Sequence, residues 1–127
     1  MVRARVSGFR AVNFGDLLFV DHAEVSFRGH VFLVLLILDA ATSLLAAYPQ
    51  SNAQTDETLD QIRAWMNDYQ CKPKPIVGYM AFSTPEFQQF YTHHGITFYG
   101  TGARSPWRAE AAVRLFKKNL PGHGKRA

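Results

Sequence analysis

The sequence feature that most constrains the fold is a continuous apolar run, Val31 to Leu38, which follows an alternating segment and a tight turn. From Asp16 to Phe27 every second side chain is mostly apolar, which is typical of an extended strand with one buried face. Arg28-Gly29 supplies the turn, and the run after it predicts a central strand that is antiparallel to the first and buried on both faces. The residues expected on the apolar face of the first strand are Leu17, Phe19, Asp21, Ala23, Val25 and Phe27.

The remainder of the chain alternates predicted strands and helices. Residues 44–48 predict a third antiparallel strand, which completes a meander. The segments predicted after it are a helix over 56–69 capped by Thr55, a strand over 76–80, a helix from Pro85 to a stop at Gly95, a strand over 96–99 and a helix over 105–120. This order predicts an α/β fold: a five-stranded mixed sheet, in which the antiparallel meander is joined by two parallel strands, flanked by helices.

Composition narrows the class of protein. The chain has 127 residues, of which 47% are hydrophobic, so it suits one domain with a real core. Cys71 is the single cysteine, which excludes an internal disulfide and a multi-cysteine zinc site. The longest apolar run is too short to cross a bilayer, and no secretory signal follows the basic N-terminus, so we expect no membrane and an intracellular location, nuclear or cytoplasmic. The net charge of +4 is compatible with a polyanionic partner.

Four segments carry a resemblance to a known family through their order. They are Gly15 to Asp21, then Leu38 to Ser43 with Ala46-Ala47-Tyr48-Pro49, then Phe87 to Tyr91 with His94-Gly95-Ile96, and last Ser105-Pro106-Trp107 with Arg108-Ala109-Glu110. Together they resemble the catalytic core of the integrases of retroviruses and long-terminal-repeat retrotransposons, which has the ribonuclease-H-like fold. The resemblance covers a core domain over residues 15–120, which leaves a basic N-terminal extension over 1–14. Residues 121–127 have no apolar pattern, so we expect a flexible basic tail there.

The resemblance also implies a set of catalytic carboxylates. The family uses three acids to hold two divalent metal ions on a phosphodiester, and Asp21 and Glu110 match the first and the third. They are the candidate catalytic and metal-binding residues, with Mg²⁺ or Mn²⁺ as the cofactor if the protein is active. At the second acid the chain has Gly78-Tyr79-Met80, so Tyr79 stands at the position of the missing Asp. A phenol with a pKa near ~10 stays neutral and is a poor ligand for a hard cation, so we expect impaired catalysis.

Two other acids are poor substitutes for the missing one. If the hairpin turns at Arg28-Gly29, Asp21 lies opposite Leu36, and Asp39 is then roughly three residues, or ~10 Å, farther along the sheet. Glu24 falls on the opposite face of its strand from Asp21. A one-metal or metal-free site is therefore the expected state.

Purely structural roles also explain the same residues. Asp21 fits a strand-end carboxylate, and Glu110 fits an i,i+4 pair with Arg114. The pair His93-His94 has no acid or cysteine nearby that would complete a zinc site, so we expect it to be packed at a helix end or to face the helix dipole there.

The partners expected are DNA and a second copy of the chain. Five basic residues around the last predicted helix are candidates for contact with DNA phosphates: Arg104, Arg108, Arg114, Lys117 and Lys118. The alternative is a solvated helix face. The resemblance implies a homodimer, with Trp65 and Trp107 as candidates for interface or core. Two other functions stay open: a non-catalytic DNA-binding or dimerisation module derived from a retroelement integrase, and an active nuclease completed by an unexpected residue.

Overall fold

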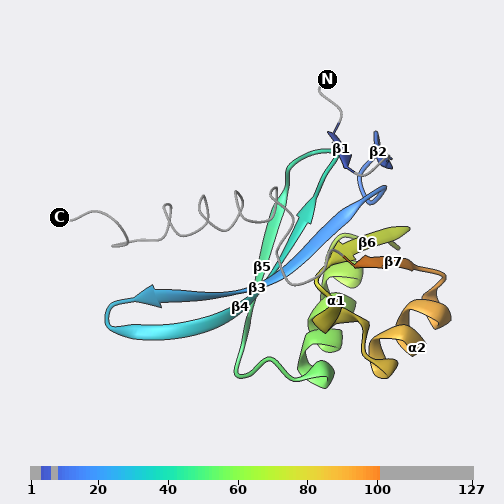
Figure 1. Cartoon of the computed structure of the whole chain (residues 1–127). Helices are drawn as coiled ribbons and strands as arrows, with labels where there is room; N and C mark the ends of the chain where they lie inside the picture. Colours follow the sequence, from blue (N-terminus) through green and yellow to red (C-terminus); the bar gives the residue numbers. More distant parts are fainter. Residues whose placement is uncertain (1–3, 7–8, 101–127) are drawn as a thin grey trace.

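The computed structural model describes residues 4–6 and 9–100, and its strands form two sheets (Figure 1). A small antiparallel sheet pairs β1 (Ala4–Val6) with β2 (Phe9–Ala11). The main sheet has the order β5-β4-β3-β6-β7. Its strands are β3 (Leu18–Phe27), β4 (His30–Asp39), β5 (Leu45–Gln50), β6 (Pro75–Gly78) and β7 (Thr97–Gly100). The strands β3, β4 and β5 are antiparallel, while β6 and β7 run parallel to β3, so the predicted five-stranded mixed sheet is confirmed.

The register of the β3–β4 hairpin follows from its turn. Arg28 and Gly29 both have positive φ, at 53° and 79°, which lets the strands reverse tightly. Phe27 then pairs with His30, and Asp21 pairs with Leu36, as expected from the sequence. The expectation that the apolar run is buried on both faces is wrong at its start, since Val31 is 66% exposed and Phe32 45%. The reason is that β5 pairs with β4 only from Leu33 onward, so the hairpin extends beyond its neighbour (Figure 1).

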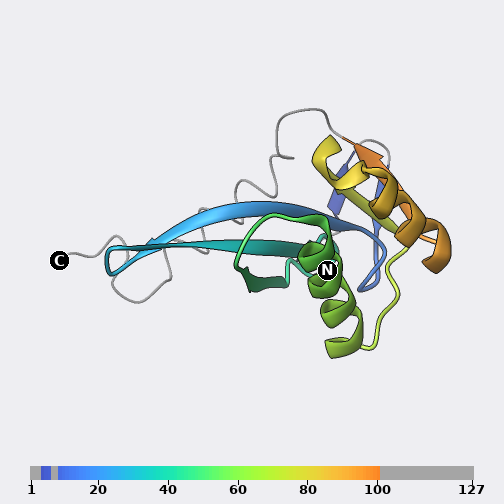
Figure 2. The ribbon, with the colours of Figure 1, turned by 90° about the horizontal axis from the view of Figure 1, so that it is seen from below.

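Two helices cover one face of the main sheet. They are α1 (Thr55–Asp68) and α2 (Pro85–His94), with a short 3₁₀ helix, η1 (Met80–Ser83), before α2. Figure 2 shows both on the same side of the strands. The core between them and the sheet includes Leu18, Val20, Leu35, Ile37, Ile62, Trp65, Phe82, Phe87, Phe90 and Tyr91. Trp65 is 1% exposed, so of the two roles predicted for it the structure supports core, whereas Trp107 lies outside the described residues.

The predicted start of α1 needs correction, and the ends of α2 do not. Helix α1 begins at Thr55 and its N-cap is Gln54, whose side chain makes no capping bond. Instead Glu57 reaches back from the first turn, and its carboxylate accepts hydrogen bonds from Ser51 N and Oγ, both at 2.8 Å. Helix α2 has Pro85 at its start and ends at Gly95 in the left-handed conformation, as predicted. The predicted last helix over 105–120 lies outside the described residues.

Residues just before position 15 pack against the rest of the protein. Ala11 is fully buried in a cluster with Leu17 and Phe19. Phe14 stacks on Trp65, with 5.4 Å between ring centroids. The division at residue 15 stays a prediction, but the contacts show that the final residues of the proposed extension contribute to the folded core.

Candidate functional site

Asp21 lies in the middle of β3 and is 3% exposed. Its side chain shares the face of the sheet with Phe19 and Ala23, because successive residues of a strand point to opposite faces. That face is the one opposite α1 and α2: its apolar clusters are formed by Phe19, Leu38 and Val77 on one side of Asp21 and by Ala23, Val34 and Leu36 on the other. Asp21 is therefore a carboxylate set between two apolar clusters, a setting in which charge is costly unless it is compensated.

Tyr79 follows the last residue of β6 and lies at the level of Asp21. The pairs Leu18–Ile76 and Phe19–Val77 fix the parallel register of β3 and β6. Two residues further along the chain are Asp21, still in β3, and Tyr79, just past the end of β6. The strands approach closely at Gly78, where a Cβ would lie 2.8 Å from Val20 Cγ2. The half-buried Tyr79 ring meets Phe82 edge-on, with 6.2 Å between centroids, and packs against the core beneath α1 and α2. The residue at the expected second acid position is thus an aromatic side chain that contributes to packing.

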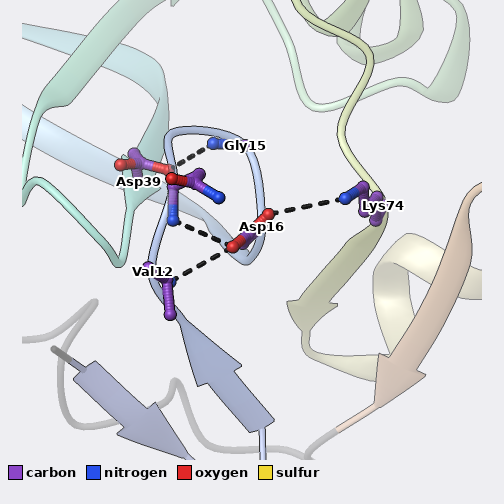
Figure 3. Close-up of polar contacts among 6 residues, drawn as sticks. Val12, Gly15, Asp16, Asp39 and Lys74 are labelled. Carbon is purple, nitrogen blue, oxygen red and sulfur yellow. Dashed lines mark hydrogen bonds and ion pairs between the residues drawn. The ribbon is translucent and has the colours of Figure 1, made fainter.

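The carboxylate of Asp39 has a structural role. It is fully buried, and its carboxylate accepts hydrogen bonds from Gly15 N at 2.9 Å, Thr42 N at 2.9 Å and Thr42 Oγ1 at 2.7 Å. Figure 3 shows the Gly15 contact beside the turn in which Asp16 accepts from Val12 N and lies 3.6 Å from Lys74 Nζ. Asp39 pairs with Leu18, whereas Asp21 pairs with Leu36. Asp39 is therefore three positions away from Asp21 along the sheet, and its side chain lies on the opposite face. It ties together the loops that precede β3 and follow β4.

Glu24 is exposed and pairs with Leu33, on the face opposite Asp21. Neither Asp39 nor Glu24 is therefore placed to complete a site with Asp21. The geometry agrees with what the alternation and the turn position predicted for both residues.

A polar network beside Asp21 was not foreseen from the sequence. His22 Nε2 lies 3.3 Å from Gln50 Oε1 and 3.2 Å from Thr58 Oγ1, and Gln50 Nε2 donates to Thr58 Oγ1 at 3.1 Å. The imidazole stacks on Phe82, with 5.0 Å between centroids. Burial lowers the pKa of His22, because the charged imidazolium is poorly solvated there, although Gln50 and Asp21 oppose the shift. One sign of this network was present in the sequence. His22, Gln50 and Thr58 are polar residues at positions that strand alternation or the helical period places on an inward face.

The described residues do not fit a two-metal centre. Within residues 4–6 and 9–100, no three His, Cys, Asp or Glu side chains lie close enough to hold a metal ion together. Tyr79 supplies no charge of the kind that Mg²⁺ or Mn²⁺ requires, and its ring packs on the side of the sheet covered by α1 and α2, away from the face that Asp21 shares with Phe19 and Ala23. Glu110 lies outside the described residues, as do all five predicted DNA contacts: Arg104, Arg108, Arg114, Lys117 and Lys118. Their roles stay predictions. None of the described helices is both long and apolar enough to traverse a lipid bilayer.

The arrangement of strands and helices is that of a ribonuclease-H-like α/β domain. No protein-family model and no curated protein matches the chain. Solved structures do: the magnesium-bound, dimeric catalytic core of HTLV-2 integrase aligns with a TM-score of 0.73 and 16% identity over 86% of this chain and 71% of that one. The catalytic core of BIV integrase aligns with a TM-score of 0.70 and 13% identity over 84% and 70%.

A chain of a larger assembly shows the same likeness. In the simian T-cell lymphotropic virus intasome in complex with the PP2A regulatory subunit B56 gamma, the alignment has a TM-score of 0.70 and 12% identity and covers 91% of this chain and 45% of that one. The protein described here has the fold of a retroviral integrase catalytic core. At these identities, the likeness concerns the fold.

Proposed function

We propose that this protein is an integrase-core-like domain of retroelement origin that binds DNA, a polynucleotidyl transferase by ancestry in which two-metal catalysis is impaired. Its partners would be DNA and a second copy of the chain. Mg²⁺ or Mn²⁺ would be the cofactor of any activity that remains.

The observation that carries the proposal is the pairing of β3 with β6. Two residues beyond the last pair, Phe19–Val77, the chain has Asp21 in β3 and Tyr79 after β6, so no acid stands at the position that follows β6. Cleavage of a phosphodiester and strand transfer need a deprotonated nucleophile and a stabilised leaving oxygen, which two divalent ions supply when convergent carboxylates hold them. With Asp21 and Glu110 alone, that set lacks one ligand.

The experiment restores the missing charge. In Tyr79→Asp we expect Mn²⁺ affinity, measured by calorimetry, to rise by about tenfold or more, because the number of charged ligands sets affinity for hard cations. Tyr79→Asn is the matched control, since it removes the same ring without adding charge. Adding Asp21→Asn to Tyr79→Asp should cancel the gain. Thermal unfolding of each variant checks that loss of the Phe82 contact has not unfolded the domain.

Strand-transfer assays test the impairment directly. The unmodified chain should show little Mg²⁺- or Mn²⁺-dependent joining or nicking of DNA. Robust turnover that Asp21→Asn abolishes would contradict the proposal and favour an active enzyme completed by another residue. DNA binding with no turnover in any variant would favour the non-catalytic module.

A further inference from the structure

A basic hollow lies between the ends of α1 and α2, on the side of the sheet away from Asp21. It measures about 350 Å³. The residues that line it are Arg63, Met66, Asn67, Gln70, Cys71, Lys72 and His94. A second hollow of about 280 Å³ shares Arg63 and His94 with the first and continues along α2 past His93. Because they share two lining residues, we call the two hollows together the groove. Figure 2 shows the two helices that carry most of its lining.

The chemistry of the first hollow is that of an anion site. Its lining holds three basic side chains, Arg63, Lys72 and His94, and two amides, Asn67 and Gln70, but no carboxylate. Arg63 Nη1 lies 3.1 Å from Asp60 Oδ1, in an exposed pair of the kind that contributes little to stability. Within the described part of the chain, no carboxylate pairs with Lys72. Gln70 Nε2 already donates to Asn67 O at 2.7 Å, and the Arg63 guanidinium lies over the Phe90 ring, 5.1 Å from its centroid. Lys72 and the remaining N–H groups of Arg63 and Gln70 are the donors that a ligand can use.

The basic groups are close enough to act on one another. Burial, and then the positive charges of His93, Lys72 and Arg63, lower the pKa of His94. These groups come from α2, the loop after α1, and α1 itself. Glu86 is the one acid among the residues of the second hollow, and it lies seven residues from His93, or about two helical turns, ~10 Å, along α2.

Capping of the helix ends does not account for these cations. Cations are favoured near helix C-termini, where free carbonyls concentrate negative charge. Here those carbonyls already accept from the backbone: Ile96 N donates to Tyr91 O at 2.8 Å, and Cys71 N donates to Met66 O at 3.0 Å. The basic side chains are not needed to satisfy them.

We propose that this groove binds phosphate groups of a nucleic-acid strand, as a contact surface separate from the Asp21 face. The inference rests on the proposed DNA binding and extends it to the helical layer of the domain. Arg63 and Lys72 supply fixed positive charge, and Asn67 and Gln70 supply neutral donors. His94 gains a proton more readily when a phosphate lies beside it, so affinity rises as the pH falls from about 7.5 to about 6.

The first test compares charge-removing variants in DNA binding. The variant Arg63→Gln/Lys72→Gln should weaken binding of a short duplex by about three- to tenfold and reduce the slope of log affinity against log salt by about two. Lys74→Gln is the matched control: it removes one charge from the same loop, at a side chain outside the hollow. If the groove variant binds DNA as the unmodified chain does, the proposal is wrong while the proposed function stands.

The second test uses inorganic pyrophosphate and does not depend on DNA binding. Titration of the imidazole signals by NMR should show the pKa of His94 rising when pyrophosphate is added, and rising less in the groove variant. If the chain binds no DNA, the proposed function fails, and this measurement decides on the groove alone. If the pKa of His94 does not change when pyrophosphate is added, the inference is wrong. It is also wrong if the groove variant alters only self-association in sedimentation equilibrium, since the groove would then be a contact between two copies.

Discussion

His22 connects three elements through a network that its ring joins as a hydrogen-bond donor. Because Gln50 Oε1 can only accept, the proton of the neutral ring lies on Nε2, which faces Gln50 and Thr58. Thr58 is fully buried and Gln50 nearly so, and Gln50 Nε2 also donates to Asn52 O at 2.7 Å. The network thus joins β3, β5 and α1 behind the Asp21 face. Such buried polar groups stabilise a fold only while every partner is satisfied.

Protonation of His22 should lower stability on the acid side of neutrality. The pKa of His22 in the folded protein is below the value of 6.5 for an unperturbed imidazole, so the unfolded chain binds the proton first. Above pH 6.5 the neutral His22 contributes its full share to the free energy of unfolding. That share is lost as the pH falls from 6.5 towards the pKa of His22 in the folded protein. We expect the melting temperature to fall between about pH 7.5 and pH 5.5, and His22→Gln to flatten that dependence. His30→Gln, at the exposed hairpin turn, is the control and should leave it unchanged. An equal slope in both variants would exclude this role.

Two glycines mark where elements begin and end, and they differ in what surrounds them. Gly95 ends α2 with φ of 69° and has open space where a Cβ would point. Gly15 precedes β3 with φ of 87°, and a Cβ there would overlap Cys71 Sγ. We expect Gly95→Ala to lower the free energy of unfolding by about 1 kcal/mol through backbone strain alone. Gly15→Ala should cost about 2–4 kcal/mol, because steric overlap adds to the strain.

Chemical denaturation of a double-mutant cycle separates the two costs. Combining Gly15→Ala with Cys71→Ala should recover the steric part and leave about the cost of Gly95→Ala. If the double variant were no more stable than the sum of the single changes predicts, contact with Cys71 would not be the cause. Both changes keep the backbone N–H of Gly15, which donates to Asp39.

Local patterns predicted the elements well where a single signal determined them. Alternation and the Arg28-Gly29 turn predicted the pairing of Asp21 with Leu36, because a hairpin turn determines every pair that follows it. Pro85 and Gly95 likewise delimited α2. The exposed start of β4 was not predictable, since exposure of Phe32 depends on where β5 ends and not on the residues of β4. Helix η1 was missed as well, because four residues are too few for a period to emerge.

For the whole molecule, the order of elements predicted the mixed sheet, and the solved integrase cores confirm the fold. Of the candidate site, the sequence predicted only the part carried by the sheet, Asp21 and Tyr79. Asp21 and Tyr79 come to one level because a parallel crossover brings β6 beside β3. The network of His22, Gln50 and Thr58 and the groove at Arg63 and His94 depend on side chains from separate elements. No pattern within one segment encodes such contacts.

Charge placement on the molecule leads to a last prediction, about the segment after residue 100. Arg114 and Lys117 belong to the five basic residues expected to follow a phosphate backbone. Each phosphate contact releases condensed counterions, so reversing both charges should weaken DNA binding and reduce the salt slope by about two or more. The measurement is fluorescence anisotropy with a labelled duplex at several salt concentrations. Arg28→Glu, which reverses an exposed cation at the β3–β4 turn, serves as the control for loss of positive charge elsewhere. If Arg114→Glu/Lys117→Glu left affinity and slope unchanged while Arg63→Gln/Lys72→Gln reduced both, DNA would be held by the helical layer alone.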